Sequence, residues 1–117
     1  KMNAEPINKE LYNKLVAAGI TSVKLCFSGG SDEGYLDIYL EGDGVDQFNE
    51  AYRKLEKEVD EWAWSVYGYS GAGDGSDYGD DIEYDLVNKK VKTSEWYTER
   101  TYGDDNEGDL VIEDEGN

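Results

Sequence analysis

The side chains that could do chemistry in this sequence are almost all carboxylates. The 117 residues include 28 aspartates and glutamates, one cysteine and no histidine. The absence of histidine removes the commonest general base, the usual serine and cysteine triads and most zinc sites. Cys26 has no histidine to activate it, and neighbouring acids such as Asp80 and Asp81 are expected by chance among so many. The composition therefore favours a non-enzymatic protein without a cofactor.

Two segments rich in glycine and aspartate, residues 28–34 and 70–79, are candidates for ligand-binding loops. Both carry acids where a phosphate-binding loop needs amide groups and lysine, so both would repel a nucleotide. An EF-hand calcium loop counted from Asp74 puts Tyr78 and Ile82 at two ligand positions, and a strand follows where a helix should. We predict no dedicated metal site. A module that binds divalent cations weakly through clustered acids stays open as an alternative.

The negative charge lies in three blocks of sequence. The net charge is −17 and the isoelectric point is near 4.1. Residues 32–50 hold seven acids, residues 74–85 hold six and residues 104–115 hold seven, and none of the blocks contains lysine or arginine. The rest of the chain has 8 acids against 11 bases, a balance of +3. The charge therefore belongs to particular segments instead of coating the whole protein.

This charge distribution predicts a protein partner with a basic surface. A net charge of −17 disfavours direct binding to nucleic acid. Carboxylates can instead stand in for phosphates in the basic groove of a nucleic-acid-handling protein, where they would also speed association. Same-face residues of a strand are about 6.6 Å apart, whereas one DNA strand carries a phosphate about every 3.4 Å. Several acidic segments would therefore have to combine. A solvated surface that serves solubility is the alternative.

We expect the partner-binding surface to combine acids of the three blocks with aromatic residues near the loop 70–79. Tyrosine-rich surfaces flanked by aspartate and glycine are typical of adaptable protein-binding patches, although core packing is the alternative role for these aromatics. The predicted residues are Asp32, Glu33, Asp37, Glu41, Asp43, Asp74, Asp77, Asp80, Asp81, Asp104, Asp105, Glu107, Trp64, Tyr67 and Tyr78.

A long amphipathic helix over residues 46–69 is the strongest structural signal and must help to position these residues. Apolar side chains recur at steps of three and four, which places them on one face. They are Phe48, Tyr52, Leu55, Val59, Trp62, Ala63 and Val66. Asp46 is the predicted N-cap and Gly68 the predicted C-terminal stop. One buried face implies a sheet beneath the helix.

The other elements complete the order α-β-β-α-β-β. The spacing predicts a short helix over residues 5–18, and alternating apolar residues predict one hairpin over 22–42 and a second over 82–97. The apolar run 110–112 would add a fifth, edge strand before a frayed acidic tail at 113–117. We predict a single α+β domain over residues 1–117, a two-layer fold with four or five antiparallel strands and both helices on one face.

Two segments carry a resemblance to small acidic proteins of bacteria and mobile elements. VKLCFSGGSDEGYLD and the later YGDDIEYDLVNKKVK resemble a pattern that ends in a G-x-x-[FI]-x-[FY]-D-[LV] hairpin, matched here by Gly79, Ile82, Tyr84, Asp85 and Leu86. This resemblance implies no activity. In size, charge and lack of catalytic residues, the chain is also similar to phage-encoded inhibitors of bacterial defence, including anti-CRISPR and anti-restriction proteins. That likeness implies a partner such as a nuclease or CRISPR component.

The remaining expectations concern location and assembly. No apolar segment is long enough to span a membrane, and a lone cysteine agrees with a reducing compartment, so we expect a cytoplasmic protein, in the host cell if phage-encoded. A homodimer is compatible with these features. The alternative function is an acidic protein-interaction module with no role in defence.

Overall fold

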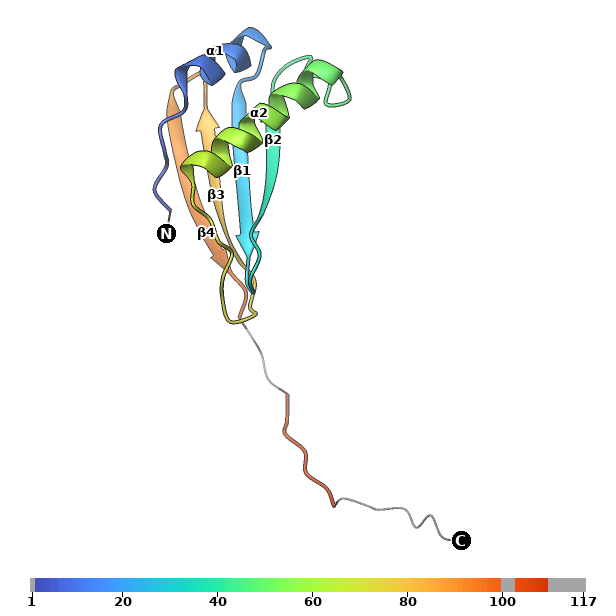
Figure 1. The fold of residues 1–117 in the computed structure, drawn as a ribbon. Helices are drawn as coiled ribbons and strands as arrows, with labels where there is room; N and C mark the ends of the chain where they lie inside the picture. The colour runs from blue at the N-terminus through green and yellow to red at the C-terminus, as the bar shows by residue number, and fades with distance from the viewer. Residues whose placement is uncertain (1, 100–102, 110–117) are drawn as a thin grey trace.

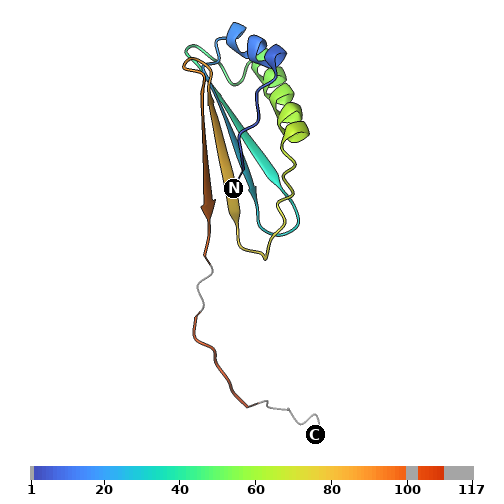
Figure 2. The same ribbon diagram turned by 90° about the vertical axis from the view of Figure 1, so that its left-hand side faces the viewer.

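The computed structural model describes residues 2–99 and 103–109 and has two layers (Figures 1 and 2). In chain order the elements are α1 (Lys9–Ala17), β1 (Ser22–Gly29), β2 (Tyr35–Glu41), α2 (Glu50–Val66), β3 (Tyr78–Asp85) and β4 (Lys90–Tyr97). The strands form one antiparallel sheet in the order β2-β1-β3-β4. Both helices lie on one face, and the other face is uncovered (Figure 2). The predicted α+β fold is confirmed.

Helix α2 begins later than predicted. Its N-cap is Asn49, whose side chain accepts the backbone N–H of Ala51 at 2.8 Å. The predicted cap, Asp46, accepts the N–H of Phe48 at 2.9 Å in the preceding turn. Phe48 therefore lies outside the helix and is 74% exposed, so its predicted place in the core is wrong. Asparagine and aspartate can both cap a helix or stabilise a turn. Here Asp46 stabilises the turn and Asn49 caps the helix.

The apolar stripe of α2 is confirmed along the middle of the helix. Val59 and Ala63 are fully buried, and the partly buried residues beside them are Tyr52, Leu55 and Trp62. Val66, in the last turn, is exposed. The helix ends there because Tyr67 adopts extended backbone angles, one residue before the predicted stop at Gly68.

Helix α1 is also shorter than predicted. Asn8 is its N-cap and accepts the N–H of Leu11 at 3.1 Å, so Pro6 lies before the helix. Gly19 follows the helix with φ of +82°, as expected for a C-terminal glycine. Residues 2–7 form an N-terminal strap on the helix side of the sheet (Figure 2), where they lie beside β3 and β4. Met2 and Ile7 of the strap pack against the rim of the core.

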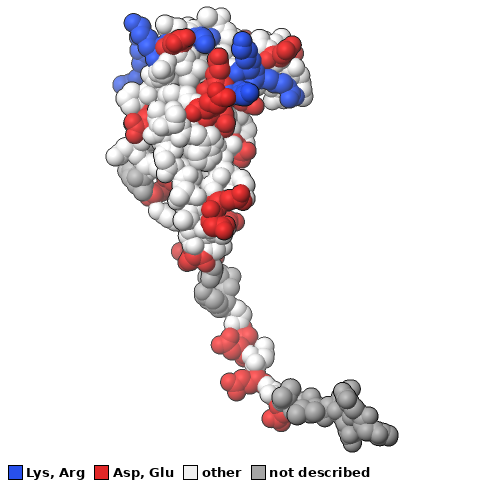
Figure 3. All heavy atoms as spheres, viewed as in Figure 1, with Lys and Arg blue, Asp and Glu red and all other residues white. Residues whose placement is uncertain are grey.

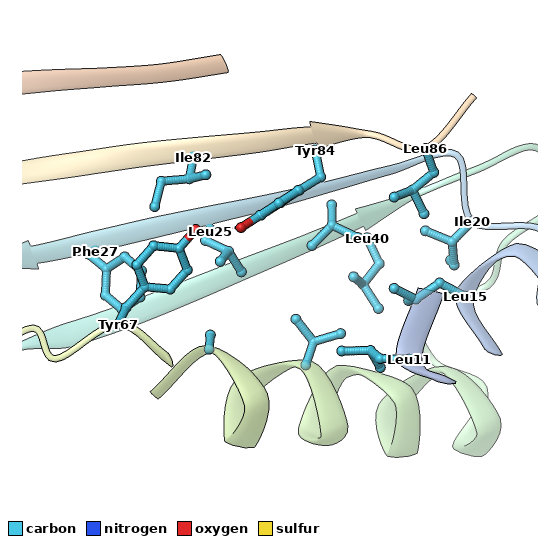
Figure 4. Packing of buried hydrophobic residues seen from close by; sticks show 13 residues of the cluster. Leu11, Leu15, Ile20, Leu25, Phe27, Leu40, Tyr67, Ile82, Tyr84 and Leu86 are labelled. Carbon is cyan, nitrogen blue, oxygen red and sulfur yellow. Dashed lines mark hydrogen bonds between the residues drawn. The ribbon is translucent and has the colours of Figure 1, made fainter. Parts of the chain in front are cut away.

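The core lies between α2, α1 and the central strands (Figure 4). Val23, Leu25 and Phe27 of β1 alternate inward, as predicted, and all three are fully buried. Their neighbours on β2 are Leu40, Ile38 and Leu36, and those on β3 are Tyr84, Ile82 and Asp80. The apolar core therefore ends at Phe27, because the strand register places the carboxylate of Asp80 beside it.

The predicted strand at 110–112 and the frayed tail at 113–117 lie outside the described residues. Within residues 2–99 and 103–109, no helix has the length and apolar character needed to cross a membrane.

Candidate acidic interface

The two glycine-rich segments meet at one end of the sheet. The Gly30 N–H donates to the Gly71 carbonyl at 2.8 Å, and the Gly73 N–H donates to the Ser31 carbonyl at 2.9 Å. A side chain on Gly29 would overlap the backbone of Gly71, so only glycine permits this approach. Glycine in these segments thus serves close backbone packing between the turn 30–34 and the loop 70–77. We call this end of the sheet, formed by that turn and that loop, the acidic end.

A groove of about 670 Å³ opens at the acidic end, beside the last residues of β4. Its lining has five carboxylates and two phenols and, among the described residues, no lysine or arginine. The lining residues are Asp74, Ser76, Asp77, Tyr78, Gly79, Asp80, Glu95, Tyr97, Thr98 and Glu99. Such a lining suits a cationic group, and above all a guanidinium, which binds carboxylates and stacks on aromatic rings.

Internal contacts hold part of this lining in place. The Tyr78 hydroxyl donates to the Ala72 carbonyl at 2.6 Å, and Asp74 accepts the Ser76 N–H at 3.0 Å. A hydrogen bond to the Glu95 carboxylate raises the pKa of Tyr97, so this phenol stays neutral and donates to the acid. The groove is therefore a built surface, part of whose lining is held by hydrogen bonds within the protein.

On the face shown in Figure 3, basic side chains lie at only one end of the molecule, and acids lie beside them there. On the face shown, lysine and arginine side chains gather at the end that carries α1, whereas only aspartate and glutamate are seen near the acidic end and on residues 103–109. A basic surface would therefore be attracted to one end of the sheet. The uneven charge distribution would therefore orient the protein toward a basic partner, which a uniform net charge would not do.

The structure brings some of the predicted acids together. Asp74, Asp77 and Asp80 line the groove. Asp32 and Glu33 lie in the adjoining turn, where the Glu33 carboxylate accepts the Tyr35 hydroxyl at 2.8 Å.

Other predicted acids lie elsewhere. Asp81 and Asp37 flank Cys26 on the uncovered face of the sheet. Glu41 ends β2 at the opposite end of the sheet, and Asp43 follows it in the connection to α2. The predicted acids of the third block, Asp104, Asp105 and Glu107, are exposed and lie beyond the end of β4 (Figure 1).

The three predicted aromatic residues also have different surroundings. Tyr78 lines the groove. Trp64 is 36% exposed and stands edge-on to Phe27, with ring centroids 5.5 Å apart. Tyr67 is only 3% exposed, so its side chain is not available to a partner and its predicted interface role does not fit the structure. The chain turns back after α2 and lays this ring against Phe27 in the core.

Sequence reasoning missed the two acids and the phenol that the end of β4 and the residues after it add to the groove, Glu95, Glu99 and Tyr97. All three follow the alternation of β4, which places them on one side of the strand. The signal was present in that spacing. However, only the pairing of Tyr97 with Tyr78 and of Glu95 with Asp80 shows that they join the acids of the second block.

Cys26 lies between Asp37 and Asp81 on the uncovered face of the sheet. Burial and a hydrogen bond with Asp81 raise the pKa of Cys26 to about 11, so the thiol stays protonated near neutral pH. In residues 2–99 and 103–109 no group of three or more cysteine, aspartate or glutamate side chains is arranged to hold a metal ion. The chain matches no family model, no curated protein and no solved structure with which it was compared.

Proposed function

We propose that this protein is a non-enzymatic binding protein whose acidic end docks on a basic surface of a protein partner. The observation that carries the proposal is the groove lined by five carboxylates and two tyrosines without a described basic residue. Arginine side chains of the partner would enter it, because a guanidinium can pair with a carboxylate and pack on a phenol ring at the same time.

The class of partner that we propose is a nucleic-acid-handling protein of a bacterial defence system, such as a nuclease or a CRISPR component. Surfaces that bind phosphates are rich in arginine and lysine, and the acidic end would compete for them. The likeness in size and charge to phage inhibitors supports this choice. The protein would then act in the cytoplasm of the host cell.

Two variants with equal charge test the site. Asp74→Asn, Asp77→Asn and Asp80→Asn together alter the groove, and Asp37→Asn, Glu41→Asn and Asp43→Asn together alter acids outside it. Each triple variant changes the net charge from −17 to −14, so general electrostatics are matched. We expect the parent and the control to capture the same protein from a bacterial lysate, and the groove variant to lose it.

The captured partner then tests the mechanism. Its association rate with the parent should fall as salt rises, and duplex DNA or RNA should compete with the parent for binding. Recovery of the same partner by the groove variant would contradict the proposed site. A partner that binds at a rate independent of salt, and together with nucleic acid, would contradict occupation of a nucleic-acid surface.

A further inference from the structure

The two edges of the sheet are protected to different degrees. At the β2 edge, the Tyr52 hydroxyl from α2 lies 3.4 Å from the Leu40 nitrogen and 3.2 Å from its carbonyl oxygen, which blocks the backbone there. Asp37 and Glu41 add like charges along this strand. At the β4 edge, by contrast, every residue is exposed. Such an edge is a ready template for another strand.

The outer backbone groups of β4 can be identified from its pairing with β3. The Thr98 N–H donates to the Asp77 carbonyl at 2.9 Å, so the even-numbered residues of β4 direct their backbone groups toward β3. Alternation in an antiparallel sheet then places the N–H and C=O groups of the odd-numbered residues at the outer edge. These residues are Val91, Thr93, Glu95 and Tyr97.

We propose that a second copy of this chain pairs with β4 through its own β4, antiparallel, about a two-fold axis at Ser94. In this register Val91 opposes Tyr97 and Thr93 opposes Glu95, so the hydrogen-bonded pairs are formed by residues whose backbone groups point outward. The two sheets then continue as one sheet of eight strands. This inference goes beyond the proposed function. It brings the groove residues Glu95, Tyr97 and Glu99 into the new strand pair, whereas Asp74, Asp77 and Asp80 lie on segments outside β4.

The side chains favour a second copy in this register. Lys89 of one copy faces Glu99 of the other, and Lys92 faces Trp96, an aromatic partner for its ammonium group. Trp96 is held in place because its indole lies across Gly79, where any Cβ would collide with the ring. Each of these pairs occurs twice, as a two-fold axis requires.

Neighbouring registers are less favourable. Moving the axis to Glu95 would set two carboxylates directly opposite each other. Moving it to Thr93 would set Val91 against Glu95 and lose the pair of Lys89 with Glu99. The register centred on Ser94 is therefore the one that the charges select.

Electrostatics favour the β4 edge over the β2 edge for self-association, because β2 carries Asp37 and Glu41 and no basic residue. Copies with net charge −17 repel each other, but Lys90 and Lys92 outnumber Glu95, so β4 carries +1. The antiparallel arrangement also sends the two acidic ends in opposite directions. Each Glu99 then lies beside a lysine of the other copy instead of another acid.

Sedimentation equilibrium of the full chain tests the interface. We expect a reversible monomer–dimer equilibrium with a dissociation constant between about 1 μM and 1 mM. Thr93→Pro should raise the dissociation constant at least about tenfold. The Thr93 N–H points outward, so this proline removes no hydrogen bond from the monomer, and circular dichroism should stay unchanged. A parent that is monomeric throughout, or a proline variant that dimerises as well as the parent, would overturn the proposal.

A cysteine on the axis tests the register. Ser94→Cys combined with Cys26→Ser should give a disulfide-linked dimer on mild oxidation, since residues of a non-hydrogen-bonded pair are about 4.5 Å apart at Cα. Lys90→Cys in the same Cys26→Ser background is the matched control, because position 90 would face Thr98 and not its own copy. Equal crosslinking of both variants would rule out pairing centred on Ser94.

Discussion

The hydroxyl groups of Tyr67 and Tyr84 are hydrogen-bonded to each other in the core, and both also bind the backbone of Glu5. The Tyr84 hydroxyl donates to the Glu5 carbonyl at 2.6 Å, and the Glu5 N–H donates to the Tyr67 hydroxyl at 2.8 Å. Because the single hydroxyl hydrogen of Tyr84 is used, Tyr67 must donate to Tyr84. The closed ring of three hydrogen bonds fastens the N-terminal strap over the sheet.

Removing one hydroxyl from this ring should destabilise the protein. Tyr84→Phe leaves the Glu5 carbonyl without its donor and the hydroxyl hydrogen of Tyr67 without its acceptor, which should cost about 1–3 kcal/mol in the free energy of unfolding. Urea unfolding followed by tryptophan fluorescence measures the loss. Tyr39→Phe is the control, since Tyr39 is 52% exposed on the uncovered face and should change stability by less than about 0.5 kcal/mol. Equal stability of both variants would contradict a structural role for the ring.

These contacts show where sequence reasoning stops. The helical period of α2 correctly predicts Val59 and Ala63 in the core. The predicted stripe ends at Val66, however, and Tyr67, which is assigned to the interface from sequence, is buried just after the last helical residue. Tyr67 reaches Glu5 across 62 positions of sequence, and no local pattern encodes that contact. Local periodicity therefore predicts which face of a helix or strand is buried. Contacts between the connecting segments depend on tertiary packing and have no such pattern.

The candidate site was predictable in part for the same reason. The three acidic blocks were visible in the sequence, but the second hairpin was predicted to begin at Ile82, whereas β3 begins at Tyr78. Two-residue alternation from Tyr78 puts Asp80 and Asp81 on opposite faces, and a loop assignment could not separate them. Glu95 joins the groove only through the register of β4 with β3. Strand pairing, which sequence does not reveal, selects which acids meet.

Close backbone packing at the acidic end should make Gly71 much less replaceable than Gly44. Both have positive φ, +73° and +71°, so alanine is strained equally at each. Nothing lies within 4 Å of a Cβ on Gly44, whereas a Cβ on Gly71 would overlap the backbone of Glu33. Gly71→Ala should therefore cost about 1–3 kcal/mol more than Gly44→Ala in urea unfolding. Equal losses would show that the turn and the loop do not pack as described.

Replacing Tyr69 with phenylalanine should have the opposite effect on stability to replacing Tyr84. Its hydroxyl is enclosed and has no hydrogen-bond partner of good geometry among residues 2–99 and 103–109, although the phenol of Tyr78 lies near enough to affect its ionisation. Tyr69→Phe removes only this unsatisfied hydroxyl, so urea unfolding should show unchanged stability or a gain of up to about 1 kcal/mol. A loss above about 1 kcal/mol would mean that the hydroxyl is hydrogen-bonded in solution.

Tyr69 also predicts how stability changes in alkaline solution. Burial, followed by Tyr78 and Asp80, raises the pKa of Tyr69 from 10.0 to about 12. The unfolded chain then releases this proton at lower pH than the folded one, so the stabilisation is complete below pH 10 and is lost as pH rises toward 12. The free energy of unfolding, measured with urea between pH 9 and 12, should fall less steeply with pH for Tyr69→Phe than for the parent. Parallel curves would contradict the shifted pKa.

Divalent cations should stabilise the protein through screening alone. Repulsion among carboxylates at the acidic end weakens the fold, so cations should raise the melting temperature, and calcium and magnesium at about 5 mM should do so to within about 1 °C of each other. The triple variant Asp74→Asn, Asp77→Asn, Asp80→Asn should respond less than the parent to both, because it carries less repulsion to screen. A calcium site would act differently, since a ligand bound only by the folded state raises stability with its own concentration and depends on its own ligands. A calcium effect several degrees larger than that of magnesium, and absent from the triple variant, would therefore contradict the screening account and place a cation site in the groove.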